Sequence, residues 1–165
     1  HVPDSVPLRI LFACDSHGTS TEAAAMLQRF TWPASTVGKV LTVIESMFVG
    51  ELPTWLEQRA RSADAEAMAQ VWVREHEAEK RTRHDELAKL CQELPAPFAN
   101  QEPIVAEGHV AEQILSAAAA ESAGLIVLGA RGIGVLGRIL LGSTSERVLN
   151  QAPCSVLIVR HHQHP

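Results

Sequence analysis

Residues 129–149, GARGIGVLGRILLGSTSERVL, lie between two apolar runs and contain five glycines. The flanking runs, residues 125–128 and 156–159, consist of Val, Ile and Leu and have the length of buried strands. Glycine loses more backbone entropy on folding than alanine, at a cost of roughly 0.5–1 kcal/mol per residue. Five glycines in one connection therefore indicate a backbone that bends sharply or closely approaches another group.

Outward from this stretch, short apolar runs alternate with helical patterns along the chain. Strands are expected at residues 8–14, 39–45, 104–107, 125–129 and 155–160. Helices are expected from Thr19 or Ser20 to about 30, from 54 to about 94 with a break near 60–64, at 110–122, and from 143 to about 151. Residues 95–103, PAPFANQEP, are expected to form a loop.

The expected strands are almost continuously apolar rather than alternating, which is typical of a parallel sheet buried on both faces. Strands that alternate with helices favour this same α/β arrangement. The sequence therefore predicts one domain over residues 1–165, with a core at about 8–160 and tails at 1–7 and 161–165. Its architecture is expected to be a doubly wound, five-stranded parallel sheet with helices on both faces.

Composition and charge exclude several classes of partner. The 165 residues carry a net charge of −5 and no basic block, which argues against nucleic acid. No apolar run approaches the roughly 20 residues of a membrane span. The start, HVPDSVPLRILFA, lacks the marks of a signal peptide, so a cytoplasmic protein is expected. Cys14, Cys91 and Cys154 form no CxxC pair, and Cys14 and Cys154 are interpreted as small core residues.

The glycine stretch is placed for ligand binding. In open parallel sheets, ligands bind outside the carboxyl ends of the strands, and this stretch leaves the fourth strand at that end. It finishes in Gly142-Ser143-Thr144 immediately before a helix, whose unpaired N–H groups and dipole favour phosphate. From these residues alone an alternative stays open, in which Gly129 and Gly142 are turn glycines and Ser143 is an N-cap.

The spacing Gly129-x2-Gly132-x9-Gly142-Ser143 resembles the ATP-binding motif of the universal stress protein family, G-x2-G-x9-G-[ST]. The resemblance also covers RILFACDSHGTSTEAAAML, VLTVIE, EGHVAEQILSAAAAESAGLIVLGARG and RILLGSTSERVLNQAPCSVLIVR. It lacks a clear signature at residues 50–100. It implies a Rossmann-like fold of the adenine nucleotide alpha hydrolase type, with strand order 3-2-1-4-5.

The resemblance further implies a site for ATP, alone or with Mg²⁺. Asp15 matches the family's nucleoside-contacting acid, Ala13 a position lining the adenine pocket, and Val43 the residue whose backbone binds adenine. The other implied contacts are Leu128 and Gly129 beside the ribose and Gly132, Gly142, Ser143 and Thr144 around the phosphates.

No catalytic residue is assigned. Asp15, Ser16 and His17 have the residue types of a hydrolytic triad, but such triads are assembled from separate segments. The glycine loop has no carboxylate for Mg²⁺ and no lysine, so fast phosphoryl transfer is not expected. We expect a stress-response or regulatory protein. The alternatives are a slow ATPase or another nucleotide-hydrolysing enzyme, a binder of AMP or cAMP, and an interaction module with a vestigial pocket.

Two further expectations concern surfaces. The last strand, residues 155–160, is apolar and is expected at a sheet edge, where it would pair two copies in a homodimer, as is common in the family. Trp55 and Trp72 lie on an apolar helical stripe and are interpreted as core or interface residues. The charged stretch at 74–90 is interpreted as a solvated face, and the terminal histidines at 161, 162 and 164 as a solvated tail rather than a metal site.

Overall fold

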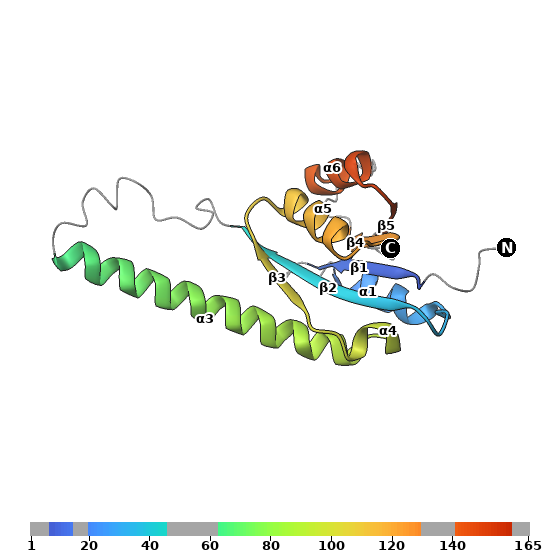
Figure 1. Cartoon of the computed structure of the whole chain (residues 1–165), viewed down its shortest axis with the longest axis horizontal. Helices are drawn as coiled ribbons and strands as arrows, with labels where there is room; N and C mark the ends of the chain where they lie inside the picture. The colour runs from blue at the N-terminus through green and yellow to red at the C-terminus, as the bar shows by residue number, and fades with distance from the viewer. Residues whose placement is uncertain (1–6, 15–19, 46–62, 130–140, 160–165) are drawn as a thin grey trace, which may run out of the picture.

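Five parallel strands form one sheet in the order β3-β2-β1-β4-β5 (Figure 1). This computed structural model describes residues 7–14, 20–45, 63–129 and 141–159. The strands are β1 (Arg9–Ala13), β2 (Val37–Ile44), β3 (Ile104–Glu107), β4 (Leu125–Gly129) and β5 (Ser155–Val159). The predicted single-domain α/β fold and its strand order are confirmed.

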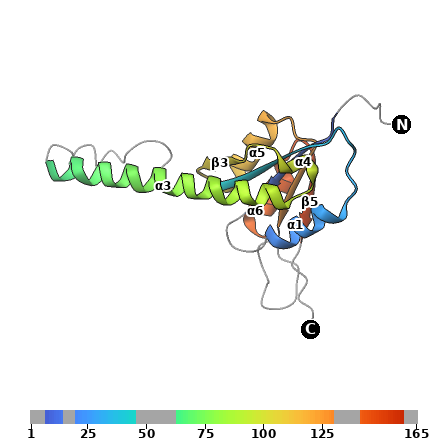
Figure 2. The same cartoon turned by 90° about the horizontal axis from the view of Figure 1, so that it is seen from below.

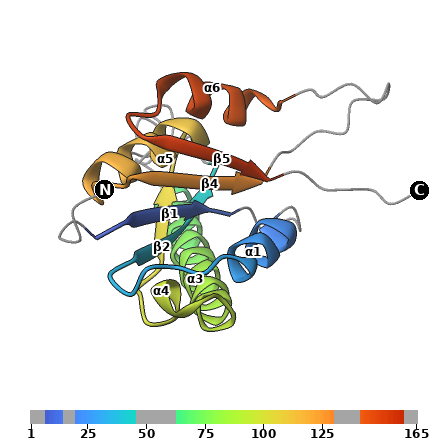
Figure 3. The same ribbon diagram turned by 90° about the vertical axis from the view of Figure 1, so that its right-hand side faces the viewer.

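Helices cover both faces of the sheet, as Figure 3 shows. They are α1 (Ser20–Arg29), α3 (Ala63–Glu93), α4 (Ala96–Ala99), α5 (Val110–Ala120) and α6 (Ser143–Gln151). The first three pack on one face, and α5 and α6 pack on the other. The chain therefore has two hydrophobic cores separated by the sheet.

The central strand β1 shows why the strands are continuously apolar. Ile10 and Phe12 point into the core under α1, α3 and α4, whereas Leu11 points into the core under α5 and α6. All three side chains are essentially inaccessible to solvent. Because successive side chains of a strand point to opposite faces, burial on both faces requires apolar residues at every position.

Some predicted boundaries shift in the structure. β2 begins at Val37, two residues before the predicted start, because the Val37 N–H donates to the Leu8 carbonyl oxygen at 2.9 Å. The helix predicted to reach residue 122 ends at Ala120. Ser122 follows with a φ of 52°, a left-handed conformation that cannot continue a right-handed helix.

The prediction of a loop at residues 95–103 is wrong, because the short helix α4 lies within it. Proline is tolerated in the first turn of a helix, where its missing N–H has no intrahelical partner. Phe98 of α4 is fully buried against β2. A Cβ on Gly38 would overlap the Phe98 ring, so the glycine in β2 leaves the space that this ring occupies.

The long helix α3 packs on the sheet only along its later part. Leu87 and Cys91 are buried, whereas Figures 1 and 2 show the beginning of α3 extending past the end of β2. Trp72 is 39% exposed and Val71 is 52% exposed, so Trp72 is not a core residue, and its alternative interpretation as an interface residue stays a prediction. Trp55 lies outside the described residues, as do 54–62 of the predicted helix.

The structure also bears on the expectations about the cysteines and about membrane-spanning segments. All three cysteines lie within the described residues, and none forms a disulfide. Cys14 and Cys154 are half-buried against the two cores, whereas Cys91 is the fully buried one. Within the described ranges, none of the helices combines the length and the apolar character that crossing a bilayer requires.

Candidate functional site

The predicted site residues that the structure describes gather at the carboxyl ends of the central strands. Ala13 is the last residue of β1 and pairs in register with Leu128 of β4. Gly129 follows as the last residue of β4. Figure 3 shows that α6 begins at this same edge, toward which the β4 and β5 arrows point. Asp15 and Gly132 lie outside the described residues, as does the predicted tail of histidines.

The start of α6 presents backbone donors. Gly142 occupies the N-cap with φ −62° and ψ 152°, and among the described residues no side-chain hydrogen bond caps the helix there. The first helical hydrogen bond runs from the Glu146 N–H to the Gly142 carbonyl at 3.0 Å. The N–H groups of the intervening residues precede the helical ladder and have no partner within it. The interpretation of Ser143 as the N-cap is therefore wrong, because Gly142 holds that position.

Side chains anchor this helix to the rest of the molecule. Val148 and Ser145 are buried, and Thr144 is half-buried. The Arg147 Nη2 atom lies 2.8 Å from Glu112 Oε1 on α5. These contacts fix the direction of α6, so its positive dipole end points to the carboxyl edge of the sheet.

The peptide groups of Val43 are a second set of backbone polar groups at the carboxyl edge of the sheet. Pairing between β1 and β2 ends at Ala13↔Leu41, whereas β2 and β3 stay paired as far as Ile44↔Glu107. The Leu41 carbonyl accepts from Cys14 on the β1 side, and the Ile44 carbonyl accepts from Gly108 on the β3 side.

Backbone groups of successive strand residues alternate between the two neighbouring strands. The peptide N–H and C=O of Val43 are therefore directed to the β1 side, past the last pair that β1 and β2 form. Thr42 fills the adjoining position, because its Oγ1 donates to the Cys14 carbonyl at 3.1 Å. Val43 can thus offer one donor and one acceptor to a planar polar group, which is what the sequence resemblance implies for this residue.

Sequence reasoning missed a polar cluster at the carboxyl end of β3. Glu107 Oε2 lies 2.8 Å from His76 Nε2, and Glu107 Oε1 forms an ion pair with Lys80. The His76 ring stacks on Trp72, with ring centroids 5.1 Å apart and planes 6° apart. The stretch at 74–90 is predicted to be a solvated face. Most of its residues are exposed, but His76, Lys80 and several later residues are half-buried, and Leu87 is buried. The i, i+4 spacing of His76 and Lys80 is the signal that could have paired them on one helix face.

The cluster shifts the pKa values of its members. The Lys80 ammonium lowers the pKa of Glu107, and the hydrogen bond to His76 lowers it further, against the opposing effect of burial. The Glu107 carboxylate in turn raises the pKa of Lys80. Each ionised group therefore stabilises the charge of the other at neutral pH.

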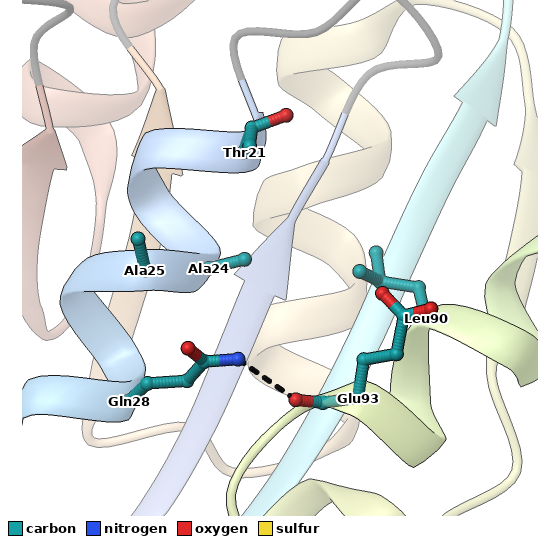
Figure 4. A pocket seen from close by; sticks show the side chains of 6 residues that line it. All are labelled: Thr21, Ala24, Ala25, Gln28, Leu90 and Glu93. Atoms are coloured by element: carbon teal, nitrogen blue, oxygen red, sulfur yellow. Dashed lines mark hydrogen bonds between the residues drawn. The ribbon is translucent and has the colours of Figure 1, made fainter.

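A separate hollow lies between α1 and α3, and Figure 4 shows its lining. It encloses about 250 Å³ and is lined by Thr21, Ala24, Ala25, Gln28, Leu90 and Glu93. Gln28 Nε2 donates to the backbone carbonyl of Glu93 at 2.9 Å across it. Of the predicted site residues that the structure describes, none lines this hollow. Among the described residues, no group of three or more His, Cys, Asp and Glu side chains is arranged to hold a metal ion.

The fold and the carboxyl edge define a doubly wound, Rossmann-like α/β protein. The model of the universal stress protein family matches residues 8–160, so the chain belongs to the universal stress protein family.

The curated relatives that the chain resembles are also universal stress proteins. One is a universal stress protein of Thermus aquaticus, 48% identical over 60 residues, which are 36% of this chain and 44% of the relative. Another is Sll1388 of Synechocystis, 36% identical over 90 residues, which are 54% of this chain and 58% of the relative. The chain matches less than two thirds of the length of each of these relatives.

Solved structures share the fold at low sequence identity. The hypothetical protein MJ0577 superposes with a TM-score of 0.64 at 20% identity, covering 95% of this chain and 98% of its own. A universal stress protein solved in complex with cAMP superposes with a TM-score of 0.56 at 18% identity, covering 94% of this chain and 98% of its own.

Proposed function

We propose that this protein binds an adenine nucleotide, with ATP as the first candidate, at the carboxyl edge of β1, β2 and β4. Bound there, the nucleotide would act as a regulatory ligand in a stress response rather than as the substrate of a fast enzyme. The observation that carries the proposal is that two sets of backbone polar groups lie at this edge, the N–H groups at the start of α6 and the peptide groups of Val43. The first suits phosphate and the second suits a base.

The phosphate end of the proposal rests on the motif Gly129-x2-Gly132-x9-Gly142-Ser143. Gly129 closes β4 and Gly142 opens α6, so the motif connects the two elements that flank the site. A helix start offers N–H donors and a positive dipole end to an anion. We assign Ser143, Thr144 and, outside the described residues, Gly132 to the phosphates, with or without Mg²⁺.

The base end rests on hydrogen-bond chemistry. Adenine has an acceptor, N1, next to a donor, the N6 amino group. The N–H and C=O of Val43 match this order, and Ala13 and Leu128 are in-register neighbours at the ends of β1 and β4. Asp15, next but one after Ala13, is our candidate for the ribose hydroxyls, which ionised carboxylates accept from readily.

A second candidate ligand is cAMP, because a structural neighbour was solved with that nucleotide. Mass spectrometry of the nucleotide released from freshly purified protein, followed by calorimetry with ATP, AMP and cAMP, separates the candidates. We expect ATP to be released and to bind more tightly than cAMP. Protein that neither releases nor binds an adenine nucleotide at millimolar concentration would contradict the proposal.

We also propose that two copies pair through β5 and Arg160, the predicted strand at residues 155–160. β5 is an edge of the sheet, and its middle residues are half-buried. The other edge, β3, has only four residues, and α3 side chains contact carboxylates at both of its ends. β5 is therefore the longer of the two edges and the better template for strand pairing.

A further inference from the structure

Two histidine–carboxylate contacts connect α3 to opposite ends of β3. At the carboxyl end, His76 Nε2 lies 2.8 Å from Glu107 Oε2. At the amino end, His84 Nε2 lies 2.8 Å from Glu102 Oε1. The two contacts have the same chemistry and the same length, but they differ in place, because the carboxyl end borders the proposed nucleotide site.

They also differ in burial and in the number of partners. The Glu107 side chain is 18% exposed and has a second partner in the ammonium group of Lys80, one helical turn beyond His76. The Glu102 side chain is 78% exposed, in the range where ion pairs contribute little. Glu107 is therefore the firmer of the two connections between α3 and β3.

From Glu107 the connection continues into β2. Glu107 pairs in register with Ile44, and the next N–H, of Gly108, donates to the Ile44 carbonyl at 3.0 Å. Ile44 directly follows Val43, the residue whose peptide groups extend past β1. This end of β2 extends past its pairing with β1, so its position depends on β3, on the packing of Val43 against the core under α5 and α6, and on the Thr42 hydroxyl contact with Cys14.

We propose that Glu107 is a positioning residue for the base: by binding His76 and Lys80 of α3, it fixes the paired ends of β3 and β2 that present the Val43 peptide groups. This inference rests on the proposed function. It identifies the ligand class as a purine with an acceptor at N1 and a donor at C6. Inosine reverses both groups, so a well-placed Val43 peptide favours ATP over ITP.

The test compares Glu107→Gln with the matched variant Glu102→Gln, which removes the carboxylate at the other end of β3. Affinities for ATP and ITP are measured by displacement of a fluorescent ATP analogue, at a temperature where melting curves show each variant folded. We expect Glu107→Gln to weaken ATP binding about fivefold, within the range of changes transmitted through packed contacts. Binding of ITP should stay unchanged, and Glu102→Gln should alter neither affinity.

Three results would overturn the inference: unchanged ATP affinity in Glu107→Gln, an equal loss for ATP and ITP, or the same loss in Glu102→Gln. An equal loss for the two nucleotides would mean general loosening of the site instead of misplacement of the base-reading edge. If the unmodified protein does not bind ATP, the proposed function itself fails. That outcome is read from the unmodified protein and is distinct from the three above.

Discussion

The backbone conformation of Gly142 does not by itself require glycine. Its φ of −62° and ψ of 152° are accessible to every amino acid. A side chain at this N-cap would project at the start of α6, where we place the phosphates. Under the proposed function, glycine at this position allows the close approach of the phosphates, which a substitution can test directly.

We predict that Gly142→Val weakens ATP binding at least tenfold, or about 1.4 kcal/mol, because the branched side chain occupies the phosphate position. Gly124→Ala is the matched control, since its Cβ would lie 3.6 Å from Leu8 Cδ1 and 3.8 Å from the Arg9 carbonyl, in ordinary contact and away from the site. Calorimetry on both variants provides the measurement. Equal ATP affinities for Gly142→Val and the unmodified protein would refute the phosphate assignment.

At the residue scale, sequence reasoning found Val43 only through a family resemblance. The physical reason became visible in the strand register, since β2 outruns β1 by a few residues at the carboxyl edge. No periodicity in the sequence shows which of two neighbouring strands ends first. Glu107 was missed for a related reason, because its partners lie 27 and 31 residues earlier in the chain.

Among the elements, the strands were predictable and α4 was not. Where continuous runs of Val, Ile and Leu alternate with helices along a chain, the runs are best explained as strands buried on both faces. Residues 95–103 contain three prolines, which favour a loop in sequence reasoning. The helix forms there because Phe98 finds a fully buried place over Gly38, a long-range contact that local preference does not contain.

The long helix shows a second limit of periodicity. A stripe at helical spacing identifies side chains that share a face, but not how far the sheet extends beneath that face. α3 runs beyond its support, so Trp72 remains partly exposed although it stacks on His76. Its packing on the body is completed by polar contacts with the ends of β3.

We predict that the contact between α3 and β3 weakens in acid. The pKa of Glu107 lies below its ordinary value of 4.5 in the folded protein, chiefly because of Lys80 and then His76. A carboxyl group with a depressed folded-state pKa adds stability above its unfolded-state pKa, and this stability is lost as the pH falls through the folded-state value. This contribution to stability should therefore be present at pH 6. It should decrease and then disappear as the pH falls below about 4.5.

Urea unfolding of the unmodified protein and Glu107→Gln at pH 6, 5, 4 and 3 measures this contribution. The unmodified protein should be more stable by about 1 kcal/mol at pH 6, the usual net contribution of an intramolecular hydrogen bond, and the difference should shrink toward zero at pH 3. Other carboxylates titrate in both proteins and cancel in the difference. A difference that stays constant from pH 6 to pH 3 would contradict this assignment.

For the whole molecule, the five-stranded order places β1 at the centre between β2 and β4 and leaves β3 and β5 as edges. The parallel sheet was predictable from the alternation of strands and helices, whereas the strand order was expected only from the family resemblance. For the assembly of copies, the sequence offered only the apolar character of the last strand, from which a dimer is expected. The structure adds a physical comparison between the two edges.

We predict a homodimer through β5. Val156, Leu157 and Ile158 are half-buried in the single chain, and a strand edge with exposed N–H and C=O groups pairs readily with another strand. Antiparallel pairing about a two-fold axis satisfies both copies and closes the assembly. Light scattering of the unmodified protein at micromolar concentration should therefore give twice the mass of one chain, 17.9 kDa.

Two variants of one residue test the assignment to β5. Ile158→Pro removes a backbone donor, and Ile158→Lys adds a charge of the same sign to the paired edge of each copy, so both should reduce the mass to that of one chain. Melting curves and ATP binding show whether each variant keeps its fold. A folded Ile158→Lys protein that remains dimeric would move the interface away from β5, and a monomeric unmodified protein would remove it altogether. If the protein is dimeric but does not pair through β5, the four-residue strand β3 is the other edge of the sheet. Glu102 and Glu107 at its ends are already in contact with α3.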